Sequence, residues 1–71
     1  MDEKKKFLLL LGDNIRKCRK EKSYSQEKFA IEIEVAKSTI QRIENGNLNP
    51  TIWTLKNIAS TLEVDIEDLI K

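Results

Sequence analysis

The chain has 71 residues, of which 35% are charged and 39% hydrophobic, and its formal net charge is +1 at pH 7. A chain of this length is expected to form one domain, residues 1–71, and to bury only about 60% of its unfolded surface, so its stability should be modest. The sequence has no histidine and one cysteine, Cys18, which excludes an internal disulfide and leaves too few ligands for a zinc or iron–sulfur site. A lone cysteine also fits a reducing cytoplasm. We therefore expect no metal, no cofactor and a cytoplasmic location.

The longest apolar run, Phe7–Leu11, follows the basic residues Lys4–Lys6, as the core of a signal peptide would. It is far shorter than the roughly 18 residues of a membrane span. It also lacks a small-residue cleavage site and continues directly into a helical pattern. The run therefore predicts neither secretion nor association with a membrane.

Apolar residues recur at spacings of three and four in five segments, which predicts five helices and no strands. The helices are expected at about residues 3–22, 26–33, 37–45, 52–62 and 66–70. Ser25, Thr51 and Asp65 precede three of them and can cap a first turn with a side-chain oxygen. Gly46 is placed to end the third. The residues expected to face inward are Leu8, Leu11, Ile15, Cys18, Phe29, Ala30, Ile33, Val35, Ile40, Ile43, Ile52, Leu55, Ala59 and Leu62.

The segment Ser25–Gly46 carries the most informative pattern of the chain. It contains two short helices whose junction, residues 34–36, is too short for anything but a sharp turn. Ala30 is small enough to let the second helix, around Ile40, cross close to the first. Two helices packed in this way predict a helix-turn-helix, whose second helix fits the major groove of DNA.

Five pieces of the sequence resemble, in order and spacing, the Xre-type helix-turn-helix family of phage lambda and related repressors. The pieces are LGDNIRKCRKEK, SQEKFA, STIQRIENG, NPTIWTLKNIASTL and VDIEDLI, and together they extend from about Leu11 to Leu69. The resemblance implies an all-α fold: a compact five-helix, lambda repressor-like DNA-binding domain with the helix-turn-helix at its second and third helices.

The polar side of the third helix predicts contacts to base edges in the major groove. Arg42 can bind guanine through its O6 and N7 atoms, and Gln41 can bind adenine with two hydrogen bonds. The resemblance implies that the positions of Lys37, Ser38 and Arg42 read bases. The base-reading candidates are therefore Lys37, Ser38, Gln41 and Arg42.

Contacts to phosphates are expected around the same helix. The resemblance places Gln26 at a phosphate-binding position, at a helix N-terminus that itself suits an anion. Thr39, Asn45 and Asn47 are similar candidates, and Asn49 can reach the DNA backbone from the next loop. The resemblance also implies an ion pair between Arg19 and Glu44, which would link the first helix to the third.

The sequence departs from the family pattern where the chain turns after three helices. The family commonly has glycine there, whereas this chain has Ser23, Glu34 and Glu63. A left-handed conformation at a residue with a Cβ costs roughly 1 kcal/mol. We therefore predict positive φ angles at these positions and a less stable domain.

A single reading helix contacts few bases, so we expect a homodimer whose reading helices lie about 34 Å apart on a pseudo-palindrome. Trp53 falls on the polar side of its helix, and large exposed aromatics are enriched at interfaces. The expected dimer interface is Trp53, Ile66 and Ile70. Leu9 and Leu10 form a rival patch, and Trp53 alone could instead cover the loop Asn47–Pro50.

The charge distribution agrees with a DNA-binding domain. Residues 1–46 carry eleven Lys and Arg against eight Asp and Glu, whereas residues 47–71 carry two against four.

The sequence gives no support for an enzyme, because it contains no Gly-rich phosphate loop and no evident pair of acids in a pocket. No small-molecule ligand is evident. The sequence predicts a transcriptional regulator, phage repressor-like or restriction–modification controller-like, that binds double-stranded DNA. The alternative is an antitoxin or another protein-interaction module that carries a helix-turn-helix. The lack of exposed aromatics for base stacking disfavours RNA.

Overall fold

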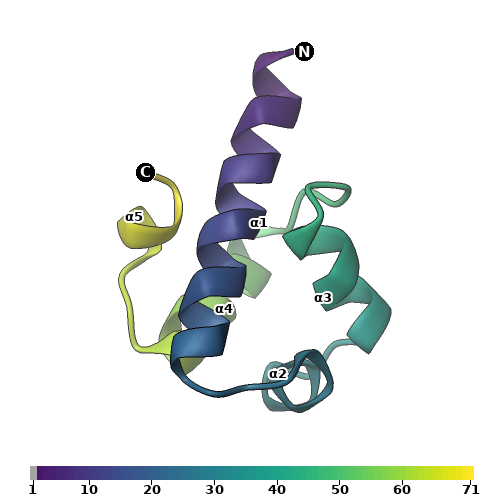
Figure 1. Ribbon diagram of the computed structural model, residues 1–71, viewed down its shortest axis with the longest axis vertical. Helices are drawn as coiled ribbons and strands as arrows, with labels where there is room; N and C mark the ends of the chain where they lie inside the picture. Colours follow the sequence, from purple (N-terminus) through teal and green to yellow (C-terminus); the bar gives the residue numbers. More distant parts are fainter. Residues whose placement is uncertain (1) are drawn as a thin grey trace.

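The computed structural model describes residues 2–71, and this part of the chain contains α-helices and no strands. The helices are α1 (Glu3–Glu21), α2 (Gln26–Glu32), α3 (Lys37–Glu44), α4 (Ile52–Leu62) and α5 (Ile66–Leu69). The predicted all-α, five-helix fold is therefore confirmed, and each predicted boundary lies within one residue of the observed one. Figure 1 shows α1 as the long central element, with α2 and α3 to one side of it and α5 to the other.

Side-chain caps explain where three of the helices begin. The Asp2 carboxylate accepts a hydrogen bond from the Lys5 N–H at 2.7 Å. The predicted cap of α2 is confirmed, because Ser25 Oγ accepts from the Lys28 N–H at 3.0 Å. The predicted cap of α4 is confirmed in the same way by Thr51. At α5 the Asp65 N–H donates to the Asp68 carboxylate at 3.0 Å, which satisfies one further free donor.

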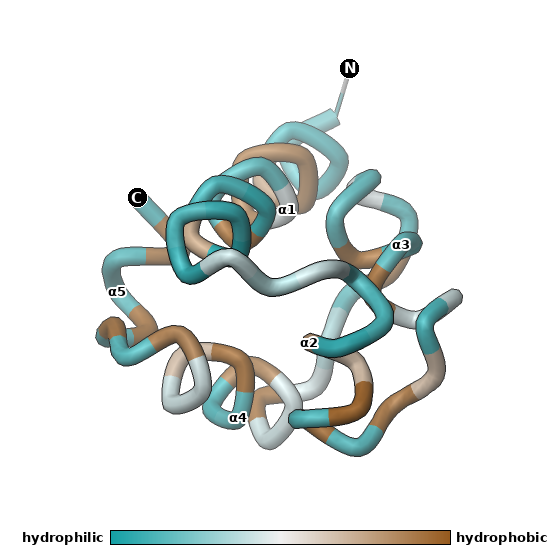
Figure 2. Tube along the Cα trace, turned by 60° about the horizontal axis from the view of Figure 1, so that its bottom comes forward, coloured by the Kyte–Doolittle hydropathy of each residue, from teal (hydrophilic) through white to brown (hydrophobic). Residues whose placement is uncertain are grey.

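The core lies between all five helices and agrees with the predicted inner stripes at most positions. Its buried apolar residues are Leu8, Leu11, Ile15, Phe29, Ala30, Ile33, Ile40, Ile43, Leu55, Ile58, Ala59, Leu62 and Leu69. In Figure 2 hydrophobic and hydrophilic positions alternate along each turn of α4, as a helix with one buried face requires.

Three predicted core positions need correction. Ile52 is 74% exposed, and Ile58 is buried in its place. The reason is that Ile52 is the first residue of α4, and helical side chains tilt toward the N-terminus, so it projects past the end of the helix. Cys18 and Val35 are only partly buried, at the edge of the core.

The predicted left-handed turns are confirmed. The φ angles are 63° at Ser23, 59° at Glu34 and 59° at Glu63, and Gly46 has a φ of 74°. Each of these residues follows a helix closely and redirects the chain. The three non-glycine turns carry a steric strain that glycine would avoid.

Candidate nucleic-acid interface

The two helices of the predicted helix-turn-helix pack directly against each other. The chain leaves α2 through a turn in which the Val35 N–H donates to the Ala30 oxygen at 3.0 Å. Ala30 is 2% exposed and Ile40 is fully buried. A small side chain on α2 therefore permits the close crossing that the sequence predicted.

The outer face of α3 carries the predicted base-reading residues. Their side chains are all exposed: Lys37, Ser38, Gln41 and Arg42. Within residues 2–71 none of the four side chains makes a hydrogen bond or an ion pair. Their donors and acceptors are consequently available to a ligand, and no internal contact has to break for one to bind.

A buried ion pair fixes α3 against α1. Arg19 and Glu44 are the two buried charged residues of the described chain, and Arg19 Nε lies 2.7 Å from Glu44 Oε2. The expected pairing is therefore present. A buried pair of this kind fixes orientation more surely than it adds stability, so its effect here is to set the direction in which α3 presents its polar face.

The predicted phosphate-binding residues occupy different surroundings. Gln26 is half-buried, and its Nε2 donates to Glu44 Oε1 at 3.0 Å, so one of its two amide hydrogens is already engaged. Thr39 is half-buried, whereas Asn45 and Asn47 are exposed. Asn47 Oδ1 accepts a hydrogen bond from Lys5 Nζ at 2.7 Å. Gln26 begins α2 and contacts the last residue of α3, Thr39 lies in the first turn of α3, and Asn45 and Asn47 follow the helix.

One side of α1 supports the whole of this surface. Its residues toward α3 recur at spacings of four and three: Lys5, Leu9, Gly12, Arg16 and Arg19. A Cβ added at Gly12 would lie 2.5 Å from the Ile43 oxygen and 2.6 Å from the Glu44 oxygen. The backbones of α1 and α3 can approach this closely only because residue 12 has no side chain.

Leu9, on the same side of α1, packs within the domain. A Cβ added at Gly46 would lie 2.8 Å from Leu9 Cδ2, so the leucine packs on the glycine that ends α3. Leu9 is therefore an intramolecular contact, although it is 37% exposed. Sequence reasoning gave no role to Lys5 or Gly12; an isolated glycine inside a helical pattern was the available signal for the latter.

Ion pairs elsewhere on α1 and between the ends of α1 and α4 reduce the basic charge of the surface. Asp13 pairs with Arg16 at 2.6 Å and with Lys17 at 3.0 Å, and hydrogen bonds from Lys17 and then Arg16 lower the pKa of its carboxyl. Lys22 pairs with Glu63 at 2.6 Å and lowers the pKa of that carboxyl in the same way. Burial raises the pKa of the Cys18 thiol, which keeps it protonated and poorly reactive.

The predicted dimer residues are not equally accessible. Trp53 is 65% exposed and Ile70 is 38% exposed, whereas Ile66 is partly buried against the core. Lys56 Nζ lies 5.2 Å from the centre of the indole ring, as in a cation–π contact. Most of the Trp53 surface is therefore exposed, and its role stays a prediction.

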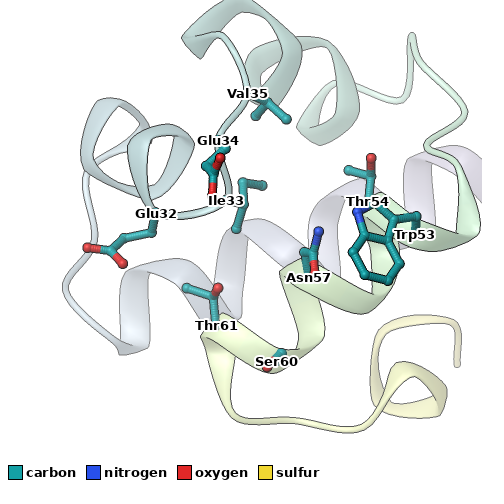
Figure 3. A pocket seen from close by; sticks show the side chains of 9 residues that line it. All are labelled: Glu32, Ile33, Glu34, Val35, Trp53, Thr54, Asn57, Ser60 and Thr61. Atoms are coloured by element: carbon teal, nitrogen blue, oxygen red, sulfur yellow. The ribbon is translucent and has the colours of Figure 1, made fainter.

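Trp53 also borders a groove of about 590 Å³. Figure 3 shows this groove between residues 32–35, at the end of α2, and the outward side of α4. Its lining combines the indole ring and the aliphatic side chains of Ile33 and Val35 with polar and acidic side chains. The groove lies away from the polar face of α3, so it is separate from the candidate DNA surface.

Membrane-spanning helices and metal-ligand clusters are both absent from residues 2–71. No helix there is both long and apolar enough to cross a bilayer. Nor does this part of the chain bring together three His, Cys, Asp or Glu side chains that could hold a metal ion.

The close pair α2 and α3, with an exposed polar face on α3, defines a helix-turn-helix domain. The family model described as helix-turn-helix matches residues 15–69, and the chain belongs to this family. The Xre-type, lambda repressor-like resemblance of the sequence is thereby confirmed.

Curated relatives are transcriptional regulators and control proteins. The regulator SlrR of Bacillus subtilis (strain 168) is 41% identical over 61 residues, which cover 84% of this chain and 40% of the relative. The control protein C.MunI of Mycoplasma sp is 36% identical over 59 residues, which cover 82% of this chain and 80% of that protein. Across the first relatives the chain spans about half of their length, between 40% and 56%.

Solved structures share the fold. The restriction–modification controller protein C.AhdI from Aeromonas hydrophila matches with a TM-score of 0.83 and 26% identity, over 87% of this chain and 94% of that one. The biofilm regulator SinR, solved in complex with DNA, matches with a TM-score of 0.80 and 37% identity. That match covers 86% of this chain and 98% of the SinR chain.

Proposed function

We propose that this protein is a cytoplasmic, sequence-specific DNA-binding transcriptional regulator. The observation that carries the proposal is the outer face of α3, where Lys37, Ser38, Gln41 and Arg42 are exposed and make no internal contact within the described chain. Polar side chains of this kind are those that recognise base edges in the major groove. The DNA complex of the related SinR supports the same role.

The phosphate contacts would hold α3 in register. Gln26 would use its remaining amide hydrogen at the N-terminus of α2, where free N–H groups also favour an anion. Thr39, Asn45 and Asn47 would contact the DNA backbone from α3 and the loop that follows it. Such contacts supply affinity and orientation but carry no sequence information of their own.

Selection from a random duplex library tests this function. The purified chain should enrich a defined motif, and binding to that motif should exceed binding to random duplex by at least about 10³-fold. Recovery of a library with no enriched motif, together with equal affinity for all duplexes, would contradict sequence-specific binding.

We further propose that the protein binds as a homodimer through α5 and the start of α4. Trp53 and Ile70 supply exposed apolar surface, and Ile66, the first residue of α5, is partly buried against the core. A two-fold interface there would pair identical patches and keep Glu67 and Asp68 away from the DNA phosphates. The enriched motif should then be a pseudo-palindrome.

Sedimentation tests this interface. The double variant Trp53→Ala, Ile70→Lys changes exposed side chains only, so the monomer should remain folded and its helical signal should be unchanged. We expect the double variant to be monomeric at a micromolar concentration where the wild-type chain is dimeric. Phe7→Ala, which removes another exposed apolar side chain from α1, is the matched control. A dimer that persists in the double variant would exclude this interface.

A further inference from the structure

The first three turns of α1 lie outside the part of the chain that matches the family. The match begins at residue 15, whereas α1 begins at Glu3. This extension reaches the far end of α3: Lys5 Nζ donates to the Gly46 oxygen at 2.7 Å and to Asn47 Oδ1 at 2.7 Å. One lysine therefore links the extension to both the end of α3 and the loop that follows it.

Both acceptors of Lys5 are neutral, so its charge is not compensated. Among residues 2–71 no carboxylate forms an ion pair with Lys5, whereas Arg16, Lys17, Arg19 and Lys22 are all paired. An ammonium group has three donors, of which two are engaged. The third donor and the full positive charge are left for an anion.

The position of Asn47 adds a second donor to the same place. Its oxygen faces the Lys5 ammonium, so its amide NH2 group points away from the lysine. Asn47 is exposed, and its hydrogen bond with Lys5 lies at the surface. Leu9, one turn further along α1, packs on Gly46 and holds this part of the loop in place.

In Figure 1 the first turns of α1 and the loop after α3 lie toward the top of the view, whereas α2 lies at the bottom. The eight residues of α3 span about 12 Å along the helix axis. The major groove is about 12 Å wide. A helix of this length in the groove brings both of its ends close to a phosphate backbone.

We propose that Lys5 and Asn47 form a phosphate-binding site for the DNA backbone at the C-terminal end of α3. The proposal rests on the DNA-binding function proposed above and extends it to the helical extension that precedes the family match. The lysine supplies the charge, and the asparagine amide supplies a directed hydrogen bond. Together with the N-terminus of α2, where Gln26 contacts Glu44, the site would give the domain a second contact to the DNA backbone beside α3.

A purely structural role for Lys5 makes a different prediction. Cations near a helix C-terminus stabilise the last carbonyl groups, and Lys5 would do so without any DNA. In that case its loss would lower the melting temperature and weaken all DNA binding by one factor at every salt concentration. A cation that neutralises a phosphate instead releases a counterion, so its loss changes the salt dependence.

The test is the affinity of wild type and Lys5→Met for the selected duplex, measured between 50 and 200 mM salt. The slope of log K against log salt should be less steep in the variant by about 0.9, and the wild-type advantage should shrink about threefold across this range. Lys5→Arg, which keeps the charge, should retain the wild-type slope. Lys17→Met, which removes a lysine paired with Asp13, is the matched control and should also retain it.

An unchanged slope in Lys5→Met would overturn the phosphate site, even if the affinity fell. Asn47→Asp provides an independent measurement, because it places a carboxylate beside Lys5 and should weaken binding most at low salt; equal binding by this variant would also count against the site. Melting curves of each variant show whether the fold is intact. If the wild-type chain bound no duplex preferentially, the proposed function itself would fail, and that result is distinct from a failure of the Lys5 site.

Discussion

Arg19 and Glu44 form a two-pronged ion pair that connects α1 to the last turn of α3. Arg19 Nε lies 2.7 Å from Glu44 Oε2, and Arg19 Nη2 lies 3.1 Å from Oε1. The remaining contacts of the pair are also made within the chain: Arg19 Nη1 donates to the Tyr24 oxygen at 2.8 Å, and Gln26 Nε2 donates to Glu44 Oε1. The pair therefore joins α1, α3, the loop at Tyr24 and the start of α2.

Replacing one partner of the pair should destabilise the domain more than replacing both. Arg19→Met or Glu44→Leu alone leaves a buried charge without its partner, and we expect a loss of about 3–5 kcal/mol. The double variant Arg19→Met, Glu44→Leu should lose much less, because neither group is left uncompensated. Urea unfolding of the four proteins measures the coupling; additive losses would show that the two groups act independently.

Gly12→Ala should destabilise the domain although alanine favours a helix. The new methyl group would meet the backbone oxygens of Ile43 and Glu44 at 2.5 and 2.6 Å, so α1 and α3 must separate. Overpacking of this kind costs about 1–3 kcal/mol, which exceeds the helix-propensity gain of about 1 kcal/mol. Lys20→Ala, at an exposed position of the same helix, is the control and should have little effect. A thermally stabilised Gly12→Ala variant would refute this packing.

Glu34→Gly should stabilise the domain. The φ of 59° at Glu34 is strained for a residue with a Cβ, and glycine removes the strain. The expected gain is up to about 1 kcal/mol of unfolding free energy. Glu32→Gly, two residues earlier and inside α2, should instead lose up to about 1 kcal/mol. Equal effects of the two substitutions in urea unfolding would be inconsistent with strain at position 34.

Most of the fold could be predicted from the sequence because the relevant signals are local. Helix boundaries follow from caps and apolar spacing, whereas the left-handed turns at Ser23, Glu34 and Glu63 were implied by the glycines that the family commonly has there. The Arg19–Glu44 pair was implied by the family resemblance, and the structure contains it. These features depend on residues near one another or on a pattern shared across a family.

The missed features depend on contacts between distant residues. Lys5 meets Gly46 and Asn47 across more than 40 positions of sequence, and spacing along one helix cannot indicate such a partner. Ile52 was wrongly assigned to the core because the apolar pattern does not report that α4 begins at the edge of the domain. The roles of the base-reading and dimer residues stay predictions, since they depend on partners that lie outside the chain.

Acid should remove the stabilisation that Asp13 provides. Hydrogen bonds from Lys17 and Arg16 lower the pKa of this carboxyl below its usual value of 3.8, so its ionised form is favoured by folding. That contribution is complete above the unfolded pKa and is lost as the pH falls through the lower, folded pKa. Asp13→Asn should therefore lower the melting temperature slightly at neutral pH and not at pH values well below the folded pKa. A difference that persists undiminished in acid would contradict this account.

Arg42 offers the sharpest test of base recognition. Its exposed guanidinium can make two parallel hydrogen bonds to guanine, a geometry that lysine matches less well. We expect Arg42→Ala to weaken binding to the selected duplex by about 1–3 kcal/mol and to relax the preference at one base position. Arg42→Lys should keep the electrostatic attraction to DNA but still relax that preference. Lysine retains the positive charge but lacks the two parallel N–H donors of the guanidinium.

The control for Arg42 is Gln26→Ala, which removes a predicted phosphate contact. This variant should weaken binding to selected and random duplexes by a similar factor, because a phosphate contact carries no base preference. Since Gln26 also donates to Glu44, its melting curve must be compared with that of the wild type. Should Arg42→Ala reduce affinity for selected and random duplexes equally, Arg42 would belong with the phosphate contacts, and the reading of bases would rest on Lys37, Ser38 and Gln41.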